Sequence, residues 1–139
     1  MNARLGAALV FVGVMSVGVA ARIGQPPDTA LYACVDNTES EATLVGATLC
    51  TGEPTEVLTA RAETDNLQVR GGALVAEVDR AGIAAVAGLS AGDLIYRVGG
   101  VDVDEAAAAT ERLGAIHADA DTVVNFLRGG RPYRVKLRR

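Results

Sequence analysis

The sequence predicts a small α+β domain behind a hydrophobic N-terminal segment. Three observations predict this class: β-rich runs between glycine turns from Gly72 to Val103, an apolar helical face over residues 104–116, and a hairpin pattern at the C-terminal end. The chain has 139 residues, enough for one domain and an appendage. Half of the residues are hydrophobic and none is Trp, so the core must be built from small aliphatic side chains.

The first part of the chain is a run without charge, Leu5 to Ala21, bracketed by Arg4 and Arg22. Its length is at the lower limit for crossing a bilayer, and its small-residue end loosely fits a cleavage site. We therefore expect residues 1–22 to be a cleaved signal peptide or a membrane anchor. If the segment is not cleaved, residues 5–21 would hold the chain in the inner membrane. A buried core helix is the remaining alternative. An exported body would lie on the periplasmic side of the inner membrane, or in the periplasm or outside the cell after cleavage.

Residues 23–54 are expected to form a tether with some structure, in which Thr43 to Leu49 could form a short strand. The tether contains the two cysteines of the chain, Cys34 and Cys50. An even cysteine count in an exported chain favours a disulfide. A two-cysteine metal site is the alternative, but its partners are lacking, because the single His of the chain is the distant His117. The sequence thus predicts a disulfide and no metal site.

The folded domain is predicted over residues 55–139. Glu56 to Ala62 is interpreted as a strand, and the alternating apolar positions of Gly72 to Val78 predict another. The small residues Gly82 to Leu89 allow one or two helical turns, and Leu94 to Val98 is rich in β-formers.

A helix is predicted next, with the Asp104 carboxylate as its cap. Its apolar residues follow at positions i, i+3, i+7 and i+10, which gives one apolar face: Ala106, Ala109, Leu113 and Ile116.

The chain ends in a predicted hairpin, Thr122 to Arg128 and Arg131 to Arg138, around the turn Gly129-Gly130. A two-residue loop pairs residue 126 with 133 and 124 with 135, and it places Pro132 opposite Leu127 at a position that needs no N–H donor. One face of the hairpin then carries Val124, Phe126, Tyr133, Val135 and Leu137.

The charge is distributed unevenly. Residues 23–121 carry all 17 acidic side chains against five Arg, a net charge of −12, whereas residues 122–139 carry six cations and no acid. Because the acidic body would repel phosphate, a nucleic-acid-binding function is excluded. Attraction of the basic end to an anionic membrane or to an acidic partner stays open.

The stretch from Gly72 to Val103 resembles the bacterial members of the PDZ family, whose pattern includes A-G-L-x-x-G-D-x-I. The matching residues are Gly82, Ala85, Ala87-Gly88-Leu89, Gly92-Asp93, Ile95, Val98, Gly100 and Val103. The departures are Ile83-Ala84, where Ser-Pro is usual, and Gly99, where Asn or Asp is usual. The resemblance covers roughly residues 55–139 and implies a small, partly open β-barrel or sandwich with two helices.

The resemblance also implies a function, since PDZ domains take a peptide as an added strand between a sheet strand and a helix. The ligand would be a protein or peptide C-terminus or an internal strand, and the ligand strand of the domain would be about Glu56 to Ala62. The family's carboxylate-binding loop, an aromatic or aliphatic residue followed by L-G-I or G-L-G, is not visible. Its place is held by Thr51 to Pro54, where Glu53 would repel a terminal carboxylate. The implied peptide-binding residues are Gly52, Thr55, Val57, Leu58, Ala106, Ala109, Thr110 and Leu113.

Catalytic patterns are not found in the sequence. There is no G-x-S-x-G, the single His117 is best interpreted as an exposed helix-end residue, and Asp93 after Gly92 is typical of a turn residue that bonds its own backbone. We therefore expect no enzyme, no cofactor and no catalytic residue.

Three binding functions remain: an interaction module tethered in the cell envelope, an assembly component resembling the C protein of type II secretion, and a substrate-presenting accessory of an envelope protease. The secretion protein has a membrane span, a small β domain and a PDZ domain; Leu44-Val45-Gly46-Ala47 resembles part of that β domain.

Overall fold

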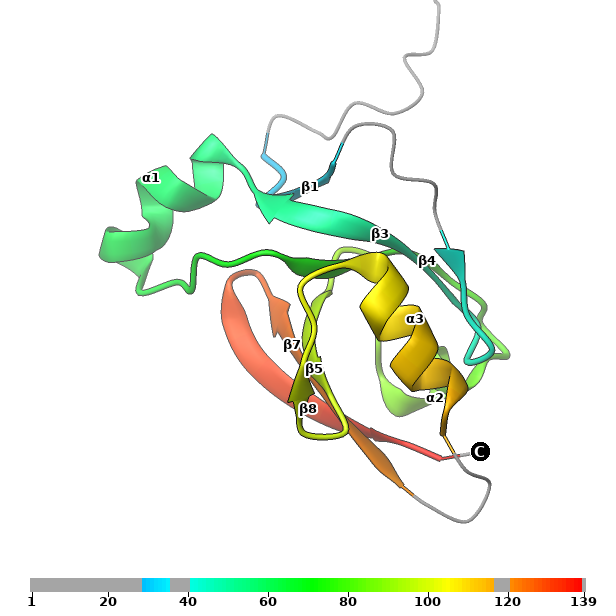
Figure 1. Ribbon diagram of the computed structural model, residues 1–139. Helices are drawn as coiled ribbons and strands as arrows, with labels where there is room; N and C mark the ends of the chain where they lie inside the picture. Colours follow the sequence, from blue (N-terminus) through cyan, green and yellow to red (C-terminus); the bar gives the residue numbers. More distant parts are fainter. Residues whose placement is uncertain (1–28, 36–40, 117–120, 139) are drawn as a thin grey trace, which may run out of the picture.

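The computed structural model of the chain describes residues 29–35, 41–116 and 121–138 (Figure 1). The predictions for residues 1–22 and for His117 lie outside these ranges. Within them, no helix is long and apolar enough to cross a membrane. The elements in chain order are β1 (Tyr32–Cys34), β2 (Glu41–Ala42), β3 (Ala47–Pro54), α1 (Glu56–Asp65), β4 (Gly72–Val78), α2 (Ile83–Ala87), β5 (Leu94–Val98), β6 (Val101–Asp102), α3 (Ala106–Gly114), β7 (Thr122–Arg128) and β8 (Arg131–Leu137).

The described strands form one antiparallel sheet in the order β1-β3-β4-β5-β7-β8, and two short strands, β2 and β6, pair with β3 and β5. The sheet is open rather than closed into a barrel, because β1 and β8 stand at opposite ends of this order. The predicted α+β class is confirmed. The structure has a third helix, α1, beyond the two that were predicted.

The main hydrophobic core lies between one face of the sheet and the helices α2 and α3, and Figure 1 shows α3 lying beside β3 and β4. Leu89, Ile95 and Leu113 belong to this core and are almost fully buried. Leu89 therefore has the core position that the A-G-L pattern predicts.

A second hydrophobic cluster lies on the other face of the sheet, because successive side chains of a strand point to opposite faces. On β4, for example, Ala73 and Val75 belong to the main core while Leu74 belongs to the second cluster. The cluster is covered by β1, α1 and the segment that follows α1. Its buried members are Tyr32, Cys50, Leu58, Leu67, Leu74, Leu94 and Leu127.

The strand predicted over Glu56 to Ala62 is wrong, since these residues begin α1. Thr55 is the N-cap, and its hydroxyl accepts a hydrogen bond from the backbone N–H of Leu58 at 3.5 Å. Glu56 in the first turn adds a favourable interaction with the helix dipole. Leu58 is the one buried residue of this helix. The apolar residues of the segment therefore do not alternate between a buried and an exposed face, as they would in a strand.

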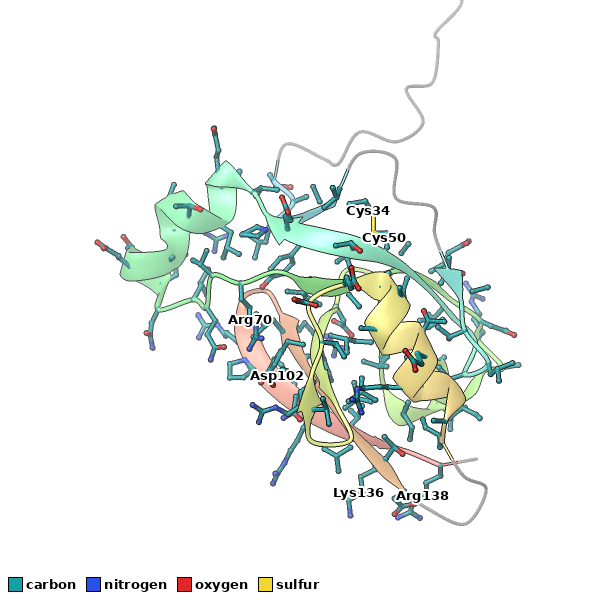
Figure 2. The ribbon with its side chains drawn as sticks, viewed as in Figure 1. Cys34, Cys50, Arg70, Asp102, Lys136 and Arg138 are labelled. Carbon is teal, nitrogen blue, oxygen red and sulfur yellow. A yellow bond between two sulfur atoms is a disulfide. The ribbon has the colours of Figure 1, made fainter. Side chains whose placement is uncertain are left out.

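The predicted boundary at residue 55 also differs from the structure, because the expected tether supplies β1, β2 and β3 to the sheet. The predicted disulfide is confirmed: Cys34 and Cys50 are bonded, with 5.7 Å between their Cα atoms, and the bond joins β1 to β3. Figure 2 shows this bond beside β3.

The C-terminal hairpin has the predicted register, with Phe126 opposite Tyr133, Val124 opposite Val135, and Leu127 opposite Pro132. The predicted apolar face is only partly covered, since Tyr133 remains 49% exposed.

Two local predictions concern caps and turns. Asp93 bonds its own turn as expected, because its Oδ2 accepts from the Ser90 N–H at 2.8 Å. Asp104 does not cap α3: the N-cap is Glu105, which makes no side-chain cap bond. Instead the Ala106 N–H donates to the Thr51 hydroxyl at 3.0 Å, so β3 itself caps the helix.

Candidate peptide-binding site

The candidate site is the outer edge of β3 together with α3. The inner edge of β3 pairs with β4, and the bond from Ala106 to Thr51 fixes the start of α3 against β3. A strand added along the outer edge would therefore lie beside the helix.

The helix side of the predicted site is packed rather than open. Ala106, Ala109 and Leu113 are each at most 1% exposed and belong to the main core, so their small side chains leave no trough at the surface. Thr110 is half-buried, and its hydroxyl is buried without a hydrogen-bond partner in the described part of the chain. An unpaired buried hydroxyl is uncommon and is the kind of group that a bound partner could satisfy.

The structure does not bring together the residues that were predicted for the strand side of the site. Gly52 is on β3 but pairs with Cys34 of β1, so its edge is already covered. Thr55 caps α1, and its hydroxyl donates to the Ala30 carbonyl at 2.6 Å. Val57 and Leu58 are on α1, and Leu58 lies in the second cluster, on the opposite face of the sheet from Ala109 and Leu113.

The sequence analysis predicted a short strand over Thr43 to Leu49 but did not place the start of β3 in the binding site. Val45, Ala47 and Leu49 are at most 3% exposed and share the main core with Ala109 and Leu113. Gly46 turns the chain into β3 with a φ of +78°, which favours glycine. A signal was present in Val45-Gly46-Ala47, but these residues were placed in the tether, outside the predicted domain.

The outer edge of β3 is occupied by the chain itself. β1 pairs with residues 52–54 and β2 with residues 48 and 49, both antiparallel. Between them, the Val35 N–H donates to the Thr51 carbonyl at 2.8 Å. At the entrance of the strand, the Thr43 N–H and hydroxyl both donate to the Ala47 carbonyl, at 2.9 and 2.8 Å.

Two acidic residues, Glu77 and Asp79, line a pocket at the entrance of β3. Arg97 and Asp102 form an exposed pair at 2.7 Å, and the Arg97 guanidinium lowers the pKa of Asp102 by hydrogen bonding. Arg70 lies over the ring of Tyr96 at 4.3 Å (Figure 2). Within the described ranges, no group of three or more His, Cys, Asp or Glu side chains could hold a metal ion.

Comparison with known proteins identifies the fold. The sequence profile of the PDZ domain family matches residues 45–114, about half of the chain. No curated protein sequence matches the chain. Two of the similar solved structures each match over 68% of this chain: an HtrA-type protease AlgW with decapeptide (22% identity, TM-score 0.53) and the HtrA3 PDZ domain bound to the phage-derived ligand FGRWV (19% identity, TM-score 0.52). The match spans 27% of the AlgW chain and 82% of the HtrA3 chain. From its sequence profile and its fold, this chain belongs to the PDZ domain family.

Proposed function

We propose that the chain is a non-catalytic interaction module, which binds an extended peptide by strand addition to the outer edge of β3, beside α3. PDZ domains are non-catalytic interaction modules, and both similar structures hold a peptide. The observation that carries the proposal is the arrangement of β3 and α3 around the turn Val45-Gly46-Ala47. This turn is similar to the L-G-I pattern of the PDZ carboxylate-binding loop, and it precedes β3 directly.

This placement removes an objection to a free C-terminus. Glu53 pairs with Ala33 at the far end of β3, whereas a terminal carboxylate would lie at the turn that contains Gly46. The core side chains of the strand and helix that bound the site include the aliphatic Val45, Ala47 and Leu113, and the acidic Glu77 and Asp79 line the pocket at the entrance of β3. We therefore expect a ligand with a small or medium apolar residue at or near its C-terminus.

The location in the cell envelope is a second part of the proposal. It is supported by the uncharged run of residues 5–21 and by the disulfide, because such bonds persist in oxidising compartments. A role in type II secretion or as the accessory of an envelope protease would fit such a location, with the PDZ domain presenting or docking a partner.

Selection from a phage library tests the peptide-binding function. Random heptapeptides displayed with a free C-terminus are selected on the full chain, and the selected peptides are then synthesised with a free and with an amidated end. We expect binding to weaken on amidation and NMR shift changes to concentrate on β3, Gly46 and α3. Shift changes confined to β8, or selection of no peptide, would contradict the proposal.

Thr110→Val is the variant that probes the helix side, since it keeps the shape of the side chain and removes the unpaired hydroxyl. Thr59→Val is its matched control, because Thr59 is exposed on α1. Ala109→Phe is unsuitable, since overpacking a fully buried position destabilises the fold by about 1–3 kcal/mol whether or not a peptide binds there.

A further inference from the structure

The outer edge of β3 carries a short strand in the position and direction of a ligand. β2 runs antiparallel to β3 and ends at the turn that contains Gly46, as a peptide does whose C-terminus points to that turn. β2 also approaches α3, which forms the second wall of the proposed site. We call Glu41–Thr43 the covering segment.

The backbone groups at the entrance of β3 are held mainly by Thr43. Its N–H and hydroxyl donate to the Ala47 carbonyl, and its hydroxyl accepts from the Ala47 N–H at 3.2 Å. A ligand strand would need these same groups of Ala47. The covering segment and a peptide are therefore mutually exclusive at this end of the site.

We propose that the covering segment is an intramolecular ligand of the β3 edge, which a peptide must displace, and that the Cys34–Cys50 disulfide holds it in place. This inference rests on the proposed function. The apparent dissociation constant of a peptide is the intrinsic constant divided by the fraction of molecules with a free edge. The strength of the covering segment thus sets the affinity of the module.

The covering segment has few contacts that resist displacement. β2 pairs over two residues, Ala42 is exposed, and neither Ala42 nor Thr43 belongs to a hydrophobic cluster. β1 differs, because Tyr32 is 6% exposed and packs in the second cluster. We therefore expect β2 to leave the edge while β1 and the rest of the sheet stay in place.

The disulfide limits how far the covering segment moves. It closes a loop with a sequence separation of 16 that contains all of the covering segment, and a closed loop has fewer open conformations than a free chain. Its buried end is Cys50, at 0% exposure on β3, whereas Cys34 is exposed. Replacing Cys34 therefore opens the loop with little disturbance of the core.

Amide exchange tests the covering segment without any ligand. The variants are Thr43→Val, which removes both hydroxyl bonds at equal shape, and Cys34→Ser, with Thr59→Val as the matched control. We expect exchange at Leu49 to become about tenfold faster in the first two variants, because Leu49 pairs with Glu41 and its N–H, like the Ala47 N–H two residues earlier, faces the outer edge of β3. Exchange in β4 and β5 should stay unchanged in all three. Unchanged exchange at Leu49 in Thr43→Val, or a loss of protection throughout the sheet, would overturn the proposal.

Peptide affinity supplies the second measurement. The probe is the heptapeptide with a free C-terminus that binds most tightly among those selected from the phage library. The selection is made on the full chain or on its Thr43→Val variant. We expect its dissociation constant to fall by about tenfold in Thr43→Val and Cys34→Ser and to stay the same in Thr59→Val. Equal affinity for all variants, with binding mapped to β3, would overturn the covering segment as a competitor and leave the proposed function intact. Binding of no selected peptide to any variant would overturn the proposed function and the competitor together.

Discussion

Replacing Asp93 with Ala should destabilise the domain, because its carboxylate joins its own turn to Arg128 of β7. Asp93 is 2% exposed and accepts from Nε and Nη2 of Arg128 at 2.8 and 2.7 Å and from the Ser90 N–H at 2.8 Å. The Arg128 Nη2 atom also donates to the Gly88 carbonyl at 2.8 Å. The hydrogen bond to Asp93 raises the pKa of Arg128, so the guanidinium stays charged at every practical pH.

The expected loss follows from what remains after truncation. Removing one partner of a buried ion pair costs about 3–5 kcal/mol when the other charge stays buried. Arg128 is 46% exposed and is rehydrated by solvent, which reduces this loss, but the Ser90 N–H loses its acceptor. We expect the free energy of unfolding to fall by about 2–3 kcal/mol in Asp93→Ala. Asp93→Asn keeps an acceptor and should lose about 1–2 kcal/mol.

Urea unfolding followed by circular dichroism measures these losses, with equal slopes required for comparison. The matched control is Asp102→Ala, since Asp102 also bonds an Arg side chain at 2.7 Å but in an exposed pair. We expect no measurable change in stability from the control, as is usual for surface pairs. A loss below about 1 kcal/mol in Asp93→Ala, or equal losses at the two positions, would refute the reasoning from burial.

Four further predictions concern single residues. Burial raises the pKa of Tyr32 from 10.0 to about 12. The free energy of unfolding should therefore fall by roughly 1.4 kcal/mol for each pH unit between those two values. Tyr32→Phe should abolish this decrease, as measured by urea unfolding at a series of alkaline pH values. Leu89→Ala should lose about 2–5 kcal/mol, because Leu89 is 2% exposed; a loss below 1 kcal/mol in urea would mean that the site is not core. Gly114→Ala should stabilise the domain by about 0.5–1 kcal/mol, because no atom lies within 4 Å of the added Cβ on α3. Gly52→Ala should instead destabilise it, with urea unfolding as the measurement for both glycine variants, since its Cβ would come within 2.7 Å of the Leu74 Cβ.

Elements with strong local signals were predictable from sequence. The hairpin register followed from the two glycines of its turn, and the disulfide from two cysteines and the expected export. The turn bond of Asp93 followed from its place after Gly92, and Leu89, the large apolar residue of the A-G-L pattern, lies in the core. In each case the residues that decide the structure are close in sequence or belong to a known motif.

The start of the domain was not predictable in the same way. The segment Glu56 to Ala62 mixes apolar residues at spacings that suit a strand or a helix, and the outcome is decided by Thr55 as cap and by the burial of Leu58 in the second cluster. That cluster is assembled from β1, α1 and four other strands, which no local pattern reveals. Once α1 was taken for the ligand strand, Gly46 and its neighbours were placed outside the domain.

The two edges of the sheet show why a partner strand is expected at β3. No described strand pairs with the outer side of β8, which carries Arg131, Arg134 and Lys136 as well as Pro132 (Figure 2 labels Lys136 and Arg138 on the final segment). Charges and proline on an edge strand oppose the addition of another strand, and this protection is permanent. Residues 47–52 of β3 carry neither charge nor proline, and their edge is covered by β2, by Val35 and by Cys34 of β1. Since the cover at residues 48 and 49 is the two-residue strand β2, we expect a peptide to bind at this end of the β3 edge.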